Sequence, residues 1–253
     1  MAGHSLNVFT GLHRQLRLIV MAVTIVRNDL FDRTRGLDRG RPFVVEAVWH
    51  LCKCLFFLTP LPVPSRFKCF MLRLFGARIG KGVVIKPQVK IHFPWKLTVG
   101  DFAWIGEEVF ILNFEPVSIG AHCCISQRAF LCGGCHDYRQ PNMPYRNGPI
   151  VIEDGAWVGA QVFVARGITI GTEAVITAGS VVTKNQPPKM VCGGYPCLPI
   201  KERWLEEHIK ADESGASWMG SQPRDLPIPS ISAPSSIGAS YRETTATGSA
   251  IGR

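Results

Sequence analysis

The middle of this chain repeats an aliphatic residue every six positions. An α-helix would bring apolar residues back every three or four positions and a half-buried strand every two, so neither element explains the spacing. A unit of six, with one inward aliphatic residue and a glycine or small residue at the bend, describes a short strand followed by a turn. Three such units form one triangular coil of a parallel β-helix. The registered positions are Ile79, Ile85, Ile91, Val99, Ile105, Ile111, Ile119, Ile125, Leu131, Ile152, Val158, Val164, Ile170, Ile176 and Val182.

The repeat is interrupted three times, and each interruption follows the third unit of a coil. The step to the next aliphatic residue is eight positions at the first two breaks and twenty-one at the third. Because three units close one triangle, all the breaks fall on the same vertex of a stack whose coils are about 4.8 Å apart. Residues 92–98, 112–118 and 132–151 are therefore expected to form a shelf, from which the longest segment projects as a loop. A functional site is expected at such an excursion from a rigid repeat.

The flanking segments are predicted to cover the ends of the stack, because open strand edges invite pairing with other chains. The apolar patterns favour two helices between about 43 and 75, parted by the proline-rich "TPLPVP", and a closing helix over 199–210. The fold class is all-β, a parallel β-helix of about five triangular coils with N-terminal helices and a short C-terminal helix. The predicted segments are an irregular, partly disordered start (1–40), a helical cap (41–76), the β-helix (77–188) with its loop (132–151), a closing segment and helix (189–212), and a disordered tail rich in Ser, Gly, Ala and Thr (213–253).

The net charge of +9 and the isoelectric point near 9.3 indicate an anionic partner, such as nucleic acid, a membrane surface or a phosphate-bearing small molecule. No nucleic-acid-binding motif is present, so no nucleic-acid partner is expected. The apolar runs 16–26 and 43–63 are too short or too interrupted by charge for a membrane span, which leaves peripheral membrane contact through the N-terminal helices. The nine cysteines include one isolated C-x-x-C, Cys132 and Cys135, so neither a zinc site nor a disulfide framework is expected, and a reducing cytoplasmic compartment is favoured.

Six stretches of this sequence carry a family resemblance that covers roughly residues 30–204. The chain resembles the hexapeptide-repeat acyltransferases, and most of all the colanic acid biosynthesis acetyltransferase (WcaF-like) branch. The resemblance implies a left-handed winding, against the usual right-handed preference of parallel crossovers. It also implies a homotrimer with active sites in the clefts between subunits. The cysteine usage and the N-terminal helices together give the expected location, which is the cytoplasm or the inner face of the membrane. The stretches are "LRLFGARIGKGVVIKP" (72–87), "PWKLTVGDFAWIGE" (94–107), "LCGGCHDY" (131–138), "IVIEDGAWVGA" (150–160), "GSVVTKNQPP" (179–188) and "GGYPCLPIKER" (193–203).

The loop carries the candidate catalytic residues. The resemblance implies that His136 is the general base, which removes the proton of a sugar hydroxyl while that oxygen attacks the thioester of acetyl-CoA, without an acyl-enzyme. Asp137 is a candidate for orienting the imidazole or contacting the acceptor, although neighbouring side chains on an extended segment tend to point apart. Cys135 stands where the branch usually has serine. A Cys-His nucleophile is the less favoured alternative, because adjacency in sequence is not catalytic geometry.

The resemblance also assigns the two ligands to particular residues. Acetyl-CoA, with no metal, is the expected cosubstrate, and Leu198 stands where many relatives carry an arginine, which leaves Lys201 for the nucleotide phosphates. The expected donor contacts are the backbones of Ala160 and Ala178, together with Thr183, Lys184 and Lys201. The resemblance makes Asn113 a candidate acceptor contact. Tyr145 and Trp157 are further candidates because sugar rings stack on aromatic side chains, with core packing as the alternative for both.

The predicted function is transfer of acetyl from acetyl-CoA to a hydroxyl of a polysaccharide repeat unit or its precursor. One alternative is a catalytically silent scaffold with the same repeat. A second is a zinc carbonic anhydrase built on His92, His122 and His136, which lack the closely spaced histidine pair of such enzymes. A third keeps the chemistry but acts on an amino sugar or on serine.

Overall fold

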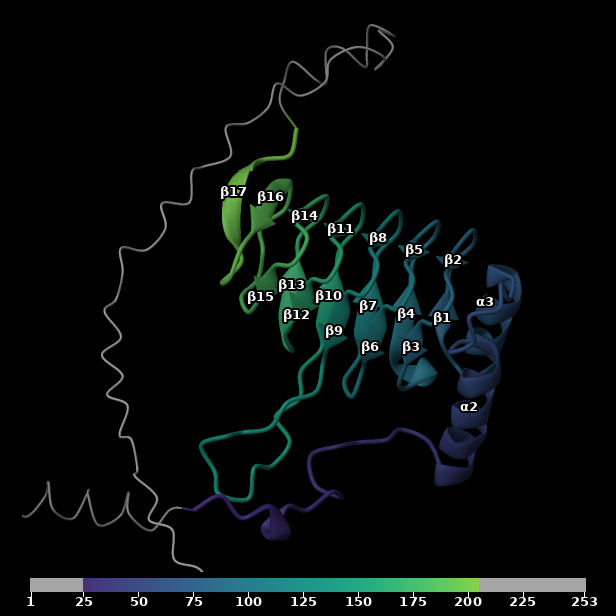
Figure 1. The fold of residues 1–253 in the computed structure, drawn as a ribbon, viewed down its shortest axis with the longest axis vertical. Helices are drawn as coiled ribbons and strands as arrows, with labels where there is room; N and C mark the ends of the chain where they lie inside the picture. The colour runs from purple at the N-terminus through teal and green to yellow at the C-terminus, as the bar shows by residue number, and fades with distance from the viewer. Residues whose placement is uncertain (1–24, 205–253) are drawn as a thin grey trace, which may run out of the picture. The chain divides into compact units, whose positions relative to one another are not determined.

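The computed structural model describes residues 25–204, which form a left-handed parallel β-helix with two helices at its N-terminal end (Figure 1). Each coil contributes one short strand to each of three parallel sheets, which we call the first, second and third faces. The first face holds β1 (Arg78–Ile79), β4 (Leu97–Val99), β7 (Val117–Ile119), β10 (Ile150–Ile152) and β13 (Ile168–Ile170). The second holds β2 (Val84–Ile85), β5 (Trp104–Ile105), β8 (Cys124–Ile125), β11 (Trp157–Val158), β14 (Val175–Ile176), β16 (Met190–Gly193) and β17 (Leu198–Glu202). The third holds β3 (Lys90–Ile91), β6 (Phe110–Leu112), β9 (Phe130–Cys132), β12 (Phe163–Val164) and β15 (Val181–Val182).

The sixfold aliphatic residues stack in register, as the periodicity predicts. On the first face Ile79 pairs with Val99 and Val99 with Ile119, and the other two faces repeat the pattern. Apart from the half-buried Ile79, all of these residues are buried and form one continuous core. The stack contains five complete coils and begins a sixth with β16, one partial turn more than the sequence predicts.

All three interruptions leave the prism at one vertex, between the third and the first face, which confirms the predicted shelf. The first holds a short 3-10 helix, η2 (Pro94–Lys96), the second joins β6 to β7, and the third is the long loop between β9 and β10. Figure 1 shows this loop, in teal, projecting from the edge of the stack. The chain before the helices, including the 3-10 turn η1 (Asn28–Leu30), runs beside it.

Two helices cover the first coil, in the places where the sequence predicts them. They are α2 (Phe43–Phe56) and α3 (Ser65–Leu74), and a proline precedes each first residue. Proline suits the start of a helix because it has no N–H to satisfy and its φ is already helical. Gly76, at φ +93°, turns the chain from the end of α3 into the first coil.

The helices supply hydrogen-bond donors to the open edge of the first coil. On the first face Arg73 donates to the carbonyls of Ile79 and Gly80, at 2.7–3.0 Å. On the second face the buried ammonium of Lys68 donates to the carbonyl of Lys86 at 2.9 Å.

The third face is closed by an indole. The Nε1 of Trp49 donates to the carbonyls of Ile91 and His92, at 3.2 and 3.0 Å. Each of the three faces therefore ends on a side-chain donor, which removes the strand edge that would otherwise be open.

The closing segment is a strand and not the predicted helix over residues 199–202. Leu198–Glu202 forms β17, which pairs antiparallel with β16 across a register shift between Val191 and Cys192. The helical pattern of the local sequence is overridden because β16 would otherwise leave its own edge unpaired. Residues 205–210 of the predicted helix lie outside the described residues, as do the predicted disordered tail and residues 1–24.

Replacing Lys68 by methionine tests the capping role of its ammonium. Methionine keeps most of the side-chain volume but leaves the Lys86 carbonyl without its donor, so we expect a loss of about 1–3 kcal/mol in the free energy of unfolding. The urea midpoint measures this loss. Arg66→Met, at an exposed position two residues earlier on α3, is the control and should change stability by less than about 0.5 kcal/mol. Equal midpoints for the two variants would reject the capping role.

Candidate active site

The long loop is a hairpin whose two arms pair with each other. The amide of Arg146 donates to the carbonyl of Cys135 at 2.8 Å, and the amide of Gly148 donates to that of Gly133 at 3.0 Å. His136 and Tyr145 face each other in an antiparallel bridge. The loop therefore projects from the shelf as an ordered arm, with His136 on one strand.

A backbone carbonyl sets the tautomer of His136. The Nδ1 atom lies 2.6 Å from the carbonyl oxygen of Met143. Because a carbonyl can only accept, Nδ1 must carry the proton, and in the neutral ring Nε2 keeps its lone pair. The imidazole is thus oriented as a base with Nε2 as its accepting atom.

Two aromatic rings that also contact each other pack against the imidazole. Tyr145 stacks on His136 with centroids 5.1 Å apart, and the ring of Phe31 meets it edge-on, also at 5.1 Å. Tyr145 in turn contacts Phe114 on the shelf. No pattern in the sequence points to Phe31, which lies in a segment predicted to be irregular, or to Met143, which acts through its backbone.

Asp137 does not orient the imidazole, which corrects one of the two roles predicted for it. Its carboxylate binds the guanidinium of Arg139 at 2.8 and 3.0 Å, and its amide donates to the carbonyl of Pro144 at 2.8 Å. The Arg139 hydrogen bonds hold the pKa of Asp137 far below its usual range. Adjacent side chains point apart in this extended arm, so Asp137 fixes the loop tip while Met143 fixes the ring.

Asn113 is enclosed in the shelf, and this burial does not favour its predicted contact with the acceptor. The side chain is fully buried, its Oδ1 accepts from the amide of Phe93 at 2.9 Å, and its Nδ2 donates to the carbonyl of the same residue. Both ends of the amide are therefore used to join the first two coils at the vertex. An acceptor would have to break buried hydrogen bonds to reach it.

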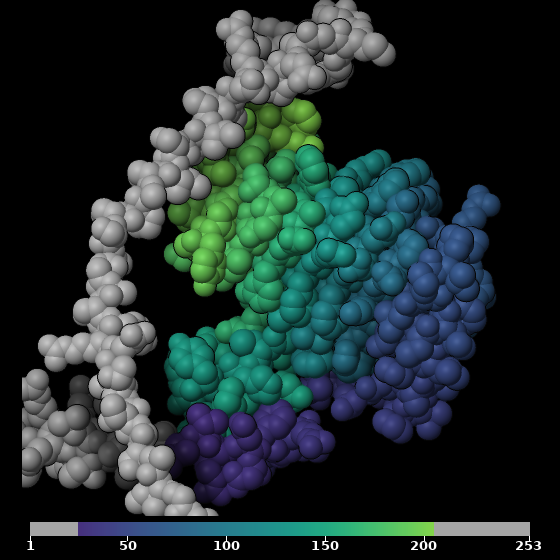
Figure 2. Space-filling model, in the orientation of Figure 1, coloured from purple at the N-terminus to yellow at the C-terminus, as the bar shows by residue number. Residues whose placement is uncertain are grey.

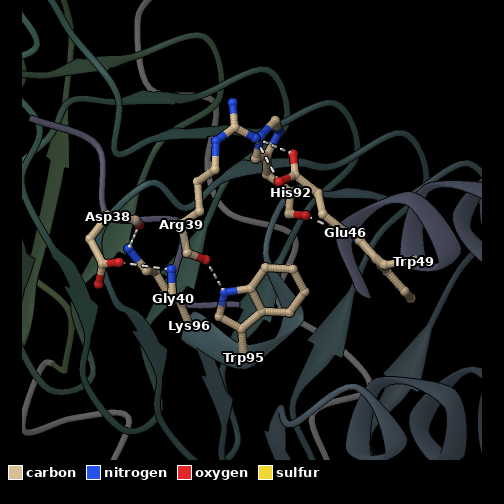
Figure 3. Close-up of polar contacts among 8 residues, drawn as sticks. All are labelled: Asp38, Arg39, Gly40, Glu46, Trp49, His92, Trp95 and Lys96. Carbon is tan, nitrogen blue, oxygen red and sulfur yellow. Dashed lines mark hydrogen bonds and ion pairs between the residues drawn. The ribbon is translucent and has the colours of Figure 1, made fainter. Parts of the chain in front are cut away.

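The segment before α2 is fixed onto the shelf and the loop. The indole of Trp95 donates to the carbonyl of Arg39 at 2.7 Å, and Lys96 donates to the carbonyl of Asp38 (Figure 3). Asn147 of the loop donates to the carbonyl of Gly36 at 3.0 Å. Figure 2 shows these purple residues lying against the teal loop. The described part of the predicted irregular start is thus a support for the candidate site.

A cavity of about 300 Å³ lies between α2 and the base of the shelf. Burial, together with the nearby Lys53, lowers the pKa of His92 at its wall to about 4, so this imidazole is neutral near pH 7. His92 contacts Phe114, with centroids 4.9 Å apart, and this ring leads on to Tyr145 and His136. A row of rings thus connects the cavity with the candidate base. The cavity is lined by Phe43, Glu46, Ala47, Trp49, His50, Lys53 and His92.

Cys135 is exposed, and its thiol lies 3.5 Å from the carbonyl of His136. The imidazole Nδ1 is already bonded to Met143, so the thiol has no base at Nδ1. This arrangement does not favour the Cys-His nucleophile.

The predicted donor backbones occupy one turn position in successive coils. Ala160 follows β11, Ala178 follows β14, and the amide of Gly179 donates to the Ala160 carbonyl at 2.8 Å. Within residues 25–204 the amides of Ala160 and Ala178 donate to no protein acceptor. The same position holds Glu107 and Gln127 in the two coils below. The upper coils therefore offer a corner with small side chains and free N–H groups.

The three predicted side-chain contacts to acetyl-CoA are all exposed. Thr183 and Lys184 follow β15 at the same vertex as the loop, two coils further along the stack, and Lys201 lies on β17. Ala160 lies at the other end of the third face, between the second and third faces. One chain therefore does not place the loop and the small-residue corner at the same edge.

Trp157 lies on β11 of the second face, and its indole donates to the hydroxyl of Ser126 at 2.9 Å. This face does not meet the vertex that carries the loop. Tyr145, and not Trp157, is therefore beside His136 within one chain.

The three histidines of the carbonic anhydrase alternative have different surroundings. His92 contacts Phe93, His122 stacks on Phe102, and His136 stacks on Tyr145. In the described part of the chain, no group of three His, Cys, Asp or Glu residues could hold a metal ion. No described helix is long and apolar enough to cross a membrane.

Comparison with known proteins places the chain among acetyltransferases. Residues 149–184 match the family described as hexapeptide repeat of succinyl-transferase. WcaF of Escherichia coli (strain K12), named as a colanic acid biosynthesis acetyltransferase, is 43% identical over 173 residues, which cover 68% of this chain and 94% of WcaF. The galactoside O-acetyltransferase of the same organism is 30% identical over 129 residues, 50% of this chain and 64% of that protein.

A solved structure shows the same architecture. The hexapeptide-repeat acetyltransferase of Vibrio cholerae aligns with a TM-score of 0.59 and 25% identity, over 64% of this chain and 93% of that one. The chain belongs to the hexapeptide-repeat acyltransferase family, and its enzyme class is acetyltransferase.

The tautomer of His136 can be measured by nitrogen NMR of the labelled imidazole. We expect the neutral ring to carry its proton on Nδ1, because the Met143 carbonyl accepts from that atom. The His136→Asn spectrum assigns the signal, and His122, whose ring stacks on Phe102, serves as the comparison. A neutral His136 with its proton on Nε2 would show that the Met143 hydrogen bond does not form.

Proposed function

We propose that this protein transfers acetyl from acetyl-CoA directly to a sugar hydroxyl of a polysaccharide repeat unit or its precursor, with His136 as the general base. The observation that carries the proposal is the imidazole on an ordered arm, with Nδ1 tied to a carbonyl and Nε2 left to accept. The names of WcaF and of the galactoside O-acetyltransferase support a saccharide acceptor.

In the proposed step, Nε2 takes the proton of the acceptor hydroxyl as its oxygen attacks the thioester carbon. A tetrahedral intermediate forms, the carbon–sulfur bond breaks, and the imidazolium returns the proton to the thiolate of coenzyme A. No acyl-enzyme is needed, which agrees with a Cys135 thiol that has no base at Nδ1. One positioned base contributes about 10²–10⁴-fold to the rate.

The proposed donor site follows the corner of small residues. The free amides of Ala160 and Ala178 suit the carbonyls of an extended thioester chain, and an amide near the thioester carbonyl would stabilise the negative charge that develops there. Thr183, Lys184 and Lys201 are proposed for the polar and phosphate end of coenzyme A. Exposed lysines can provide the point charges that phosphates require.

We propose a homotrimer with each active site between two prisms. The outward side chains of the first face are largely polar, whereas the third face presents a ladder of phenylalanines. Phe110 stacks on Phe130 at 4.7 Å, and Phe130 contacts Phe163 at 5.5 Å. An apolar outer face suits contact with a neighbour. It would also let the loop of one subunit meet the Ala160 corner of the next, which one chain does not achieve.

The proposed acceptor site begins at Tyr145 and extends along the shelf. Sugar rings have apolar faces that pack on aromatic side chains, and Tyr145, Phe114 and His92 form such a row toward the cavity beside α2. A saccharide of more than one sugar unit would fit along this row of rings. The proposed cellular location is the cytoplasm, where acetyl-CoA is available.

Replacing His136 by asparagine separates the base from the support of the loop. The Asn Nδ2 can still donate near the Nδ1 position, but no atom can take a proton, so we expect kcat to fall by about 10²–10⁴-fold. The KM for acetyl-CoA should not change. Thiol release is measured with acetyl-CoA and a galactoside acceptor, and the acetylated product is identified by mass spectrometry. Tyr138→Phe, an exposed change in the same loop, is the control. Turnover within threefold of wild type would reject His136 as the base, and a wild type that acetylates no saccharide and binds no acetyl-CoA would support the silent scaffold.

Replacing Ala160 by glutamine tests the donor corner with a residue that the same turn position already holds one coil below. The longer side chain should occupy the proposed path of the thioester chain, and we expect the KM for acetyl-CoA to rise about tenfold or more. Gln127→Ala is the matched control and should leave this KM unchanged. Equal KM values for wild type and Ala160→Gln would place the donor elsewhere.

A further inference from the structure

The outward side of α2 is apolar although it contacts no part of the described protein core. Val44, Val48, Leu51 and Leu55 are spaced by four, three and four residues, which places them on one narrow stripe of the helix. Their exposed fractions are 70, 48, 59 and 57%. The opposite side of the helix already fills the core with Trp49. The stripe therefore needs a partner other than the coils.

The next helix continues the same surface. Phe67, Phe70 and Leu74 of α3 are spaced by three and four residues and are also exposed, while Leu72 of the same helix is fully buried. Phe56 and Phe67 join the two helices, with ring centroids 5.0 Å apart. We call the combined surface the outer cap face. Its residues are Phe43, Val44, Val48, Leu51, Leu55, Leu61, Phe67, Phe70 and Leu74.

The charges around this face are almost all positive. Residues 41–76 contain five basic residues and one acidic residue, Glu46. Lys68 and Arg73 bind carbonyls of the first coil, and Lys53 lines the cavity. Within this described range, Arg41 and Arg66 are left as the cations free to meet an occupant. Arg39 holds that carboxylate at 2.6 Å, which cancels the negative charge. Arg66 lies beside Phe70 on α3 and forms no ion pair within residues 25–204. An occupant of this face should therefore be apolar in its interior and anionic at its surface.

We propose that the outer cap face docks onto an anionic membrane surface. Apolar side chains that enter the headgroup region, combined with basic residues that attract anionic lipid, are the two contributions that hold peripheral proteins on membranes. A membrane matches both properties of the face, whereas a copy of this chain would bring a second set of positive charges. This interaction goes beyond the proposed acetyl transfer and does not depend on it.

The position of the helices gives the docked orientation. Both lie at the β1–β3 end of the stack (Figure 1). Trp49 and Leu72 on the core side of these helices are buried, whereas the apolar residues of the outer cap face are exposed. Docking would therefore set the stack axis upright on the membrane. Any symmetric assembly with parallel stacks would present all of its cap faces at the same end, and several weak contacts would then act together.

Vesicle sedimentation tests the proposal with the full chain. Wild type should bind vesicles of phosphatidylcholine mixed with phosphatidylglycerol, and should bind less as salt rises or when phosphatidylglycerol is omitted. The double variant Leu51→Ser, Leu55→Ser should bind about tenfold more weakly or worse, because two large apolar side chains are lost from the contact. Ile200→Ser, at a residue equally exposed on β17 at the other end of the stack, should bind like wild type.

Two control measurements show whether the double variant is still folded and active. The double variant should keep its circular dichroism spectrum and its turnover of soluble substrates, because both leucines are exposed and lie outside the proposed active site. Wild type that stays in the supernatant with anionic vesicles overturns the proposal. So does equal binding by wild type and the double variant. A change in oligomeric mass of the double variant, measured by light scattering, would assign the face to a second copy of the chain instead.

Discussion

Registered stacking of the coils is the constraint on which the rest of this structure depends. Every coil must offer the next the same row of backbone donors and acceptors, so irregular chain can leave only between strands. Here it leaves at one vertex in three successive coils. The first coil has no predecessor, and side chains of Trp49, Lys68 and Arg73 supply the donors that a preceding coil would have supplied. The shelf and the helical cap therefore both follow from the need to pair the backbone of every coil.

The candidate site separates two tasks that a single carboxylate often performs. The carbonyl of Met143 sets the tautomer of His136, whereas the carboxylate of Asp137 pairs with Arg139 at the loop tip. A backbone acceptor has no proton to lose, so the orientation of the ring does not change as nearby carboxylates titrate. Tyr145 and Phe31 then limit the tilt of the ring. The imidazole is positioned by packing and backbone geometry.

The sequence predicted the parts of this structure whose cause is local and repeated. Burial of every sixth residue identifies the coils, and the gaps in that repeat locate the vertex and the loop with His136. The sequence-based prediction failed where a local structure is set by contacts between distant segments. The strand β17 forms because β16 needs a partner, and Asn113 turns inward because the backbone of Phe93 needs one. Phe31 and the Met143 carbonyl carry no pattern that could reveal them, since one lies in irregular chain and the other acts through an atom common to all residues.

The hairpin loop contains the acceptor that orients its own imidazole, because His136 and Met143 are only seven residues apart. The hydrogen bond that orients the imidazole therefore does not involve any residue of the coils. Substitutions in the scaffold can accumulate without retuning that hydrogen bond, and changes in loop length elsewhere on the shelf can reshape what the protein accepts. A β-helix of this kind could exchange one such loop for another during evolution. It would then gain a new acceptor specificity without any change in the coils.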